Sequence, residues 1–538
     1  MGNALHGIDL SIILITFLMT IGIGLYFSRS QKNSDRYFTG SKKIPSWVIG
    51  MSIFATVISS VTFLAYPSAA YTGNWILLVQ GLMMPVVLLA SIRFIVPLFR
   101  RVIRLSAFEY FERRFGVFAR IYSSIAFLLT HFTKMGTVLY LLSLAVYSIS
   151  GIPITTIILA VGLTIVFVSL IGGIEAVFWM DTLQGFLQLA GGTICIVLLL
   201  FLPEGGPVMV ITKAFEWDKI GFGPYTMDFA GLTFIVLVCN GLFYGFQKYG
   251  TDQTIVQRYL TAKDDKGAVK ATYIGTFISV GAWIMFMFLG SALFVFYKTT
   301  GTLPEGIKAE EIFPYFMKTQ LPVGVVGIVL AALICAAFST LTSDINSISA
   351  VSVQDYYQRA KPDCTDRQRL NMGRFFVLLA GLGCVGISLL YVAWDGQGVL
   401  GVVFELYAIF SSGIVGIFLL GLFSKRANKQ GLSVGLIACI LFTAYALLTS
   451  VPLGSGGEKR LLLDLGRYNF PHHRLMLGVY SHLIVIIVGY IASFFFKSQQ
   501  ASDNLTVYGY YADLKAKRGN GESRGNGESR GNGKNGGR

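Results

Sequence analysis

The chain alternates between long apolar segments and shorter, more polar loops over nearly its whole length. A helix needs about 20 mainly apolar residues to cross the hydrocarbon core of a bilayer, and by this criterion the pattern predicts about thirteen spans, numbered zero to twelve. They lie at 7–27, 44–71, 75–98, 117–149, 152–172, 174–202, 229–249, 270–297, 322–357, 372–395, 398–424, 431–451 and 475–496. The pattern therefore indicates an all-α integral membrane protein.

Two of the predicted spans contain residues that interrupt a membrane helix. Span one reads FATVISSVTFLAYPSAAYTG, with hydroxyls in mid-run and Pro67 after them. Span six contains CNGLFYGFQKYG, with Asn240, Gly241, Gly245 and Lys248. Two broken spans five helices apart are typical of an inverted repeat, in which spans one to five and six to ten are related by a pseudo-twofold axis in the membrane plane. Such a fold predicts a binding site at the midplane, between the breaks.

The same pattern divides the chain into five parts. They are an extra N-terminal helix with its loop at 1–43, a first repeat at 44–202, a second repeat at 203–424, two C-terminal helices at 425–497, and a tail at 498–538. From Arg518 the tail repeats Gly, Asn, Glu, Ser and Arg. Because this composition cannot bury apolar surface, we expect the tail to be disordered.

Composition and charge agree with a membrane protein. Hydrophobic residues make up 54% and charged residues 13% of the chain, against about 25% charged residues in soluble domains. The net charge of +15 does not indicate nucleic acid binding, because Lys and Arg gather in alternate loops at 29–43, 100–120, 258–270, 359–374 and 425–429. Basic loops mark the cytoplasmic side, so we predict a cell-membrane protein with its N-terminus outside and its C-terminus in the cytoplasm. We interpret most of this charge, Arg258 included, as topology rather than ligand binding.

The most informative segment is LAALICAAFSTLTSDINSISAVSVQDYY in span eight. Its residues Ser339, Thr342 and Ser343 are spaced i, i+3 and i+4, so they share one helix face. Hydroxyls and freed backbone carbonyls are hard oxygen ligands that suit Na⁺. Far upstream, Asp181 stands alone in the apolar run VFWMDTLQGFLQLAGG, and a membrane carboxylate usually faces the bundle interior with a partner. A cation between the two segments would account for both, which predicts a cation-coupled transporter.

Four stretches give the chain a family resemblance. They are DRYFTGSKKIPSWVIGMSIFATVISSVTFLAYPSAAYTGNW (35–75), GGIEAVFWMDTLQGF (172–186), QTIVQRYLTAKD (253–264) and AAFSTLTSDINSIS (336–349). With them the chain resembles the solute:sodium symporter family, which includes sodium–glucose and sodium–iodide transporters, as far as about residue 497. The first stretch and ARIYSSIAFLLTHFTKMGTVLYL (119–141) are most similar to the bacterial sodium/sialic acid symporters.

The resemblance implies Na⁺ as coupling ion, bound at two sites. The first lies between spans one and eight and involves the carbonyls of Ala55, Ile58 and Ala336 with the hydroxyls of Ser339 and Thr340. The second, in the sialic acid subgroup, uses the side chains of Asp181, Ser339, Thr342 and Ser343.

The resemblance also implies a substrate site with Ser59, Thr62, Gln80 and Lys134. Lys134 stands where the subgroup has an Arg that meets the substrate carboxylate, so the charge is kept but the two-pronged fork is lost. Val57 replaces a third hydroxyl, and Gln80 is displaced by one residue from the Gln of the subgroup. Sialic acid, carried inward with two Na⁺ by alternating access, is the first choice. A neutral monosaccharide and another small organic anion stay as alternatives.

Several polar residues keep a structural interpretation beside the functional one. Asp181 could pair with a helix end, Lys134 could belong to an ion pair, and His131 is more often a satisfied core histidine than a ligand. Asp344 and Glu405 are expected to be paired or to lie at the edge of a cavity. At the break in span six, Phe243 and Tyr244 could stack on a substrate or pack against protein.

Other classes of protein lack their motifs in this sequence. No HExxH or His cluster indicates an enzyme, and no GxxxxGK[ST] indicates a primary pump. A sensor would need an appended signalling domain, and broken helices around a carboxylate favour alternating access over a channel. We expect the bilayer, Na⁺ and a small solute as partners, and no nucleic acid or obligate protein partner.

Overall fold

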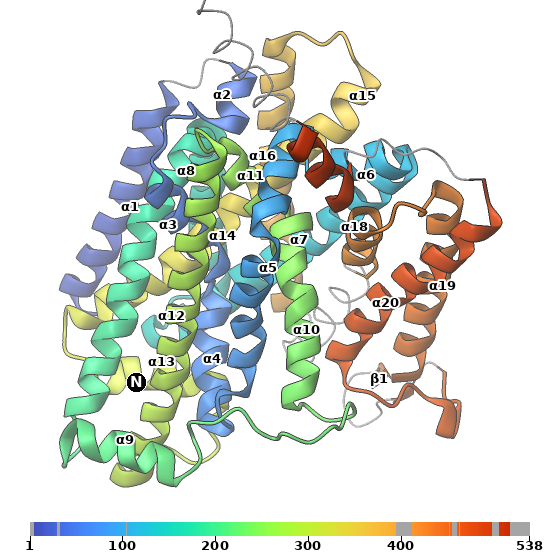
Figure 1. Cartoon of the computed structure of the whole chain (residues 1–538). Helices are drawn as coiled ribbons and strands as arrows, with labels where there is room; N and C mark the ends of the chain where they lie inside the picture. Colours follow the sequence, from blue (N-terminus) through green and yellow to red (C-terminus); the bar gives the residue numbers. More distant parts are fainter. Residues whose placement is uncertain are drawn as a thin grey trace, which may run out of the picture.

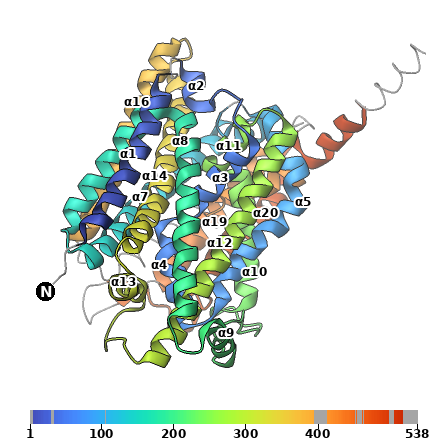
Figure 2. The same ribbon diagram turned by 90° about the vertical axis from the view of Figure 1, so that its left-hand side faces the viewer.

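The computed structural model describes residues 5–29, 33–103, 105–393, 412–450, 452–453, 460–461, 463–497 and 505–516. These residues form a helical bundle whose long helices run roughly in one direction (Figures 1 and 2). The strands of the described part are β1 (Pro452–Leu453) and β2 (Arg460–Leu461), which pair antiparallel. The predicted all-α class is thus confirmed for the described residues, apart from this short pair of strands.

Nine helices of the described residues are long and apolar enough to cross a membrane, and a bent pair makes up to ten. Eight of the nine are α1 (Gly7–Ser28), α5 (Leu78–Val102), α7 (Val117–Ser150), α12 (Asp265–Thr300), α14 (Val325–Ser352), α16 (Asp366–Ala393), α19 (Lys429–Ser450) and α20 (Arg474–Ala492). Most of predicted span ten lies outside the described residues, and its end is α18 (Ile414–Phe423). Shorter helices cap the bundle: α2 (Ser34–Thr39), α6 (Glu109–Phe115), α9 (Gly206–Glu216), α13 (Ala309–Gln320) and α15 (Gln358–Ala360).

Span one is broken where the sequence predicts. Helices α3 (Ser46–Val57) and α4 (Ser60–Thr72) meet at a bend of 60°. Between them Ile58 and Ser59 are extended, with φ/ψ of −86°/115° and −114°/176°. An interrupted helix leaves carbonyls of its last turn without amide partners. The break therefore exposes backbone oxygens in the interior of the bundle.

Predicted spans four and five form α8 (Ile154–Phe201), whose 48 residues contain one non-helical residue, Gly173, at φ 58° and ψ −174°. A straight helix of this length would measure about 72 Å, more than twice the hydrocarbon thickness of a bilayer. Glycine adopts this positive φ without steric cost, and so Gly173 separates two helical segments at the predicted boundary. The reversal lies beside α2, where Arg36 pairs with Glu175 at 3.4 Å.

Span six is interrupted later than the sequence predicts. Helix α10 (Phe234–Phe246) continues into a π-helical turn at Gln247–Thr251, Asp252 is extended, and α11 (Gln253–Thr261) follows. The backbone stays helical at Asn240, because the Asn240 side chain forms hydrogen bonds with other helices and not with its own backbone. It accepts from Gln80 of α5 and donates to a backbone carbonyl of α20. Gly241 serves close packing instead, since a Cβ there would lie 2.8 Å from the Gln80 carbonyl oxygen on α5.

Helix α14 is the centre of the bundle. Almost all of its residues from Val326 to Ser352 are buried. It contacts α1, α3, α7, α8 and α16, which surround it in both views (Figures 1 and 2). Its polar middle therefore faces protein rather than lipid. This arrangement places the hydroxyls of span eight against the break in span one.

Helix α4 is held against α12 by a close backbone approach, which gives a test of the packing. A Cβ at Gly290 of α12 would lie 2.7 Å from Pro67 Cα and 2.8 Å from Ala70 Cβ, and would clash with the Pro67 carbonyl oxygen. A Cβ at Gly281 of the same helix would meet nothing within 4 Å. We expect Gly290→Ala to destabilise the protein by about 1–3 kcal/mol, the usual cost of overpacking.

Thermal unfolding of the purified protein in detergent measures this effect. Gly281→Ala is the matched control, and we expect it to leave the melting temperature unchanged or slightly raised, because Ala favours helix over Gly. Equal melting temperatures for the two variants would contradict the packing of α4 on α12.

Candidate functional site

The break in span one lies against the middle of α14. Ser339 Oγ donates a hydrogen bond to the Ala55 carbonyl oxygen at 2.8 Å and lies 3.3 Å from the Ala336 carbonyl oxygen. Thr340 Oγ1 lies 3.0 Å from the Ala336 oxygen and 3.5 Å from the Ile58 oxygen. All five residues are buried. The five oxygen donors of the first predicted sodium site are thus brought together.

This convergence depends on the broken backbone. In a continuous helix the Ala55 carbonyl would accept from the amide of Ser59, four residues on. That amide instead lies 3.4 Å from Thr62 Oγ1, at the start of α4. Hydroxyls in membrane helices usually bond to a carbonyl of their own preceding turn, whereas Ser339 reaches across to α3. Neutral carbonyl and hydroxyl oxygens in a buried cluster fit the chemistry of Na⁺.

The second predicted site is centred on Asp181 of α8, which is fully buried between α3, α11 and α14. Its Oδ2 accepts hydrogen bonds from Ser52 Oγ at 2.5 Å and from Arg258 Nη2 at 2.9 Å. Its Oδ1 has no hydrogen-bond partner among the described residues. The expectation that this carboxylate faces the bundle interior with a partner is confirmed, and the partner is an arginine.

Arg258 was wrongly assigned to a cytoplasmic loop from the sequence. Its side chain is fully buried, and it donates to Ser52 Oγ at 2.8 Å, to the Thr254 carbonyl oxygen at 2.6 Å and to Ser343 Oγ. The physical reason is the late break in span six, since the turn at Asp252 directs α11 back into the bundle. The sequence did contain one sign of such a partner, because a lone carboxylate in a membrane span usually pairs with a cation. Residue spacing alone could not show which cation pairs with Asp181.

The hydroxyls predicted for the second site differ in what they contact. Ser343 Oγ donates to the Ser339 carbonyl oxygen at 2.6 Å and lies 3.1 Å from Thr56 Oγ1, besides accepting from Arg258. Thr342 Oγ1 donates to the Phe338 carbonyl oxygen of its own helix at 3.0 Å. Ser343 therefore belongs to the same polar cluster as Asp181, whereas the Thr342 hydroxyl bonds only within α14.

Two glutamines of α8 extend this polar face and were missed from the sequence. Gln184 and Gln188 follow Asp181 at i+3 and i+7, the spacing of one helix face. Gln188 Nε2 donates to Ser339 Oγ at 3.3 Å. In the described part of the chain Gln188 Oε1 and both polar atoms of Gln184 are buried without a hydrogen-bond partner. A buried polar atom left unpaired costs about 1–3 kcal/mol, so this face has capacity for a polar ligand or an ion.

Lys134 of α7 pairs with a carboxylate of α14. Its ammonium nitrogen lies 3.0 Å from Asp344 Oδ2 and 3.2 Å from Oδ1. The Lys134 side chain is 23% exposed, whereas that of Asp344 is fully buried. Lys134 and Asp344 therefore form an ion pair, the arrangement that the sequence analysis kept beside substrate binding, and the Lys134 side chain is partly exposed.

The ion pair continues into a buried chain of ionisable groups. His131 Nδ1 lies 2.9 Å from Asp344 Oδ1, and His131 Nε2 lies 3.9 Å from Asp252 Oδ1. Lys248 Nζ lies 2.6 Å from Asp252 Oδ2. His131 is thus the satisfied core histidine expected from the sequence. Asp252, which the sequence analysis did not single out, joins the break in span six to α7 through this histidine.

The other predicted substrate residues lie on separate elements. Ser59 and Thr62 flank the start of α4, and Gln80 Nε2 donates to Asn240 Oδ1 of α10 at 2.9 Å. No hydrogen bond between described residues joins Ser59, Thr62 or Gln80 directly to Lys134. Ser60 links α4 to α7 by donating to the Val138 carbonyl oxygen at 3.1 Å, one turn from Lys134.

The aromatic residues near the break in span six pack against protein. The ring centroids of Phe243 and His482 lie 5.2 Å apart. Lys248 Nζ lies 5.4 Å from the ring centroid of Tyr244. Glu405, which was expected to be paired or to lie at the edge of a cavity, is outside the described residues.

Curated relatives of the chain are membrane symporters. A sodium/sialic acid symporter of Aliivibrio fischeri is 31% identical over 493 residues, which cover 90% of this chain and 92% of the relative. A sodium/sialic acid symporter of Proteus mirabilis is 32% identical over 424 residues, covering 78% and 85%. A sodium/glucose cotransporter of Vibrio parahaemolyticus is 28% identical over 506 residues, covering 86% and 90%.

Solved structures agree with these relatives. A Na⁺-coupled sialic acid symporter in a substrate-bound, outward-open state has a TM-score of 0.83 and 29% identity, covering 92% of this chain and 99% of that one. A nucleobase–cation symport transporter in a closed conformation has a TM-score of 0.50 at 16% identity, covering 87% and 97%, which shows likeness of fold alone. The model of the sodium:solute symporter family matches residues 37–439. The chain therefore belongs to the sodium:solute symporter family.

Proposed function

We propose that this protein imports sialic acid together with two Na⁺ ions by alternating access. The family consists of sodium-coupled membrane transporters and not of enzymes, and the relatives of the sialic acid subgroup support the substrate. The observation that carries the proposal is the convergence of Ala55, Ile58, Ala336, Ser339 and Thr340 oxygens at the broken helix. A bound Na⁺ there would join α3 and α14 and so tie the break in span one to the rest of the bundle.

In this proposal the substrate carboxylate binds the accessible side of the Lys134 ammonium. An ammonium has three donors, so it can bond Asp344 and a second carboxylate at once. The buried Asp344 fixes the position of Lys134, and His131 also contacts Asp344, through Oδ1. Ser59, Thr62 and Gln80 would bond the hydroxyl and amide groups of the sugar.

A neutral monosaccharide is the second candidate. The Lys134–Asp344 pair favours it, because an ammonium already neutralised by a protein carboxylate is not required to meet an anion. A small organic anion other than sialic acid would need Lys134 in the same way as sialic acid.

The proposed architecture has thirteen spans. Spans one to five at 44–202 and six to ten at 203–424 form two inverted repeats, preceded by an extra helix within 1–43 and followed by two helices within 425–497. The N-terminus lies outside and the tail from 498 in the cytoplasm. The two observed interruptions, at Ile58–Ser59 and at Gln247–Asp252, support this arrangement, since each lies in the first span of its repeat.

Uptake into proteoliposomes tests the function. We expect labelled sialic acid to accumulate only with an inward Na⁺ gradient, and faster with a negative interior, because two Na⁺ and one monoanion carry one net charge. At −100 mV that charge supplies about 2.3 kcal/mol, and a tenfold Na⁺ gradient adds about 1.4 kcal/mol per ion. A panel of labelled sugars and organic anions identifies the substrate class. Equal uptake with K⁺, or uptake driven by a proton gradient without Na⁺, would disprove sodium coupling.

Loss of the hydroxyls at the first sodium site should weaken Na⁺ binding and with it coupled transport. We expect Ser339→Ala and Thr340→Val to raise the Na⁺ concentration for half-maximal uptake at least tenfold, because a buried ligand that contacts a cation is typically worth about 1.5–3 kcal/mol. The matched controls are Ser279→Ala and Thr272→Val on α12, whose buried hydroxyls bond only the preceding turn. If the controls lose as much transport as the site variants, the hydroxyls of α14 have no special role.

The second sodium site predicts opposite effects for the two members of the Asp181–Arg258 pair. Removing Asp181 alone would leave a buried guanidinium unpaired, which is strongly destabilising, so Asp181→Asn is combined with Arg258→Gln. We expect the Hill coefficient for Na⁺ to fall from near two towards one in this double variant. Arg258→Gln alone should keep a coefficient near two with tighter Na⁺ binding, since Na⁺ becomes the cation that neutralises Asp181. A coefficient unchanged in the folded double variant would make Asp181 a structural residue.

Substitutions of Lys134 distinguish the substrate candidates. If a carboxylate binds its ammonium, Lys134→Gln combined with Asp344→Asn should raise the dissociation constant of sialic acid roughly 10- to 150-fold, the equivalent of about 1.5–3 kcal/mol for a charged hydrogen bond. Lys134→Arg should be tolerated, because a guanidinium can form a two-pronged contact with the carboxylate. Titration of sialic acid and of galactose on the purified proteins measures the difference. Equal losses for both ligands, or binding of galactose alone, would refute the sialic acid proposal and leave the sodium symporter.

A further inference from the structure

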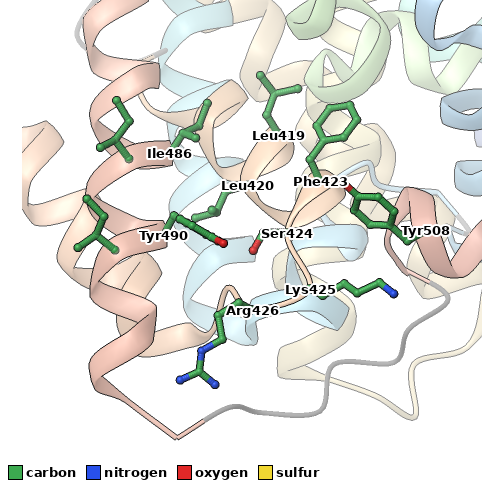
Figure 3. Close-up of a pocket in the computed structure, with 11 residues that line it drawn as sticks. Leu419, Leu420, Phe423, Ser424, Lys425, Arg426, Ile486, Tyr490 and Tyr508 are labelled. Atoms are coloured by element: carbon green, nitrogen blue, oxygen red, sulfur yellow. The ribbon is translucent and has the colours of Figure 1, made fainter.

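The outer surface of the bundle has a groove whose lining residues lie C-terminal in the sequence to those of the proposed transport site. It has a volume of about 610 Å³ and is lined by the end of α18, the turn that follows it, the second half of α20, and Tyr508 of the helix at 507–516. Figure 3 shows Leu419 and Ile486 at one end of the groove, and Lys425 and Arg426 at the other. The groove is therefore apolar along its length and basic at one end.

The apolar part faces outward from the protein. Along α20 and the 3₁₀ turn that continues it (Ser493–Phe495), one helix face has the i, i+3, i+4, i+7 spacing, with Ile487, Tyr490, Ile491 and Phe494. These four side chains are 41–55% exposed, and Phe423 across the groove is 44% exposed. Large apolar side chains exposed on a membrane helix contact acyl chains, so this face lies in the hydrocarbon region of the bilayer.

The basic end lies where the helices stop. Lys425 and Arg426 follow Ser424, the residue that ends α18, and precede α19. Arg426 Nη2 donates to the carbonyl oxygens of Phe494 and Phe496, just after the end of α20, at 3.3 Å each. Lys425 Nζ lies 5.4 Å from the ring of Tyr508. No acidic side chain of the described residues forms an ion pair with either cation, and none lines the groove.

These features match one molecule of an anionic phospholipid. Its acyl chain fits the apolar length, its phosphate fits two cations at the depth where helices end, and tyrosines such as Tyr490 are typical of that interface. A zwitterionic lipid would bring its own ammonium beside Lys425 and Arg426, which is unfavourable. We propose that the groove between α18, α20 and Tyr508 is a binding site for an anionic phospholipid such as phosphatidylglycerol.

Native mass spectrometry of the full chain in detergent tests the site. The protein is titrated with phosphatidylglycerol and, separately, with phosphatidylcholine of the same acyl chains. The wild type should retain phosphatidylglycerol in preference. Lys425→Gln combined with Arg426→Gln should weaken that binding about 25-fold, since each basic residue near an anionic lipid contributes about fivefold.

A matched control separates this site from general attraction of anions. Lys429→Gln combined with Lys497→Gln removes the same charge near the ends of α18 and α20, from exposed residues that do not line the groove, and it should change binding less than twofold. Lys425→Arg combined with Arg426→Lys should bind like the wild type, because this variant keeps both charges.

Four results would overturn the proposal. One is an equal loss of phosphatidylglycerol in both double glutamine variants, and another is equal retention of phosphatidylcholine by the wild type. The third is displacement of the lipid by soluble glycerol 3-phosphate, which would assign the basic end to a free phosphate. If instead the wild type is a dimer that Ile487→Glu dissociates, the groove belongs to a second copy of the chain and the lipid proposal is wrong.

Discussion

The interruption of backbone hydrogen bonding at Ile58 and Ser59 is the constraint on which the rest of the structure depends. Inside a bilayer every backbone polar group needs a partner within the protein, because hydrocarbon offers none. Carbonyls released by the break can be satisfied only by donors from another helix or by a cation. Helix α14 supplies these hydrogen-bond donors. Its middle must therefore be both polar and buried, and this requirement places α14 at the centre of the bundle. The direct bond from Ser339 to the Ala55 carbonyl is the contact that a Na⁺ ion would replace.

The second interruption, at Gln247–Asp252, organises the buried charges. On one side Asp252 pairs with Lys248 and lies near His131, which in turn contacts Asp344, the partner of Lys134. On the other side the turn directs α11 inward, so that Arg258 meets Asp181. One irregular segment thus supplies groups to both the proposed substrate site and the proposed second sodium site. Paired charges in a protein interior are costly to separate. A movement of this segment would therefore also displace groups at the proposed substrate site and at the proposed second sodium site.

The parts of the fold that follow from local physics could be predicted from the sequence. Apolar length predicted the long apolar helices of the described residues, and mid-membrane hydroxyls with Pro67 predicted the break in span one. The spacing of Ser339 and Ser343 indicated the polar face of α14. The partner of Asp181 could not be predicted, because Arg258 lies beside a basic loop in the sequence and is redirected only by a turn whose position depends on packing. Asn240 illustrates the same limit, since it reads as a helix breaker but bonds to Gln80 of another helix. Family resemblance, not spacing, identified Ala55, Ile58 and Ala336, whose contribution is a backbone carbonyl that no side-chain pattern reveals.

Hydrogen–deuterium exchange across the break tests the central claim most directly, because it reports the backbone whose carbonyls the sodium ion would bind. The measurement compares peptides that cover residues 54–63 of the purified protein in Na⁺ and in K⁺ at equal ionic strength. The account predicts that Na⁺ slows exchange of the amides at the break in the wild type, and that this protection is lost in Thr340→Val but kept in Thr272→Val. Equal exchange in Na⁺ and K⁺ would contradict a sodium ion at the break.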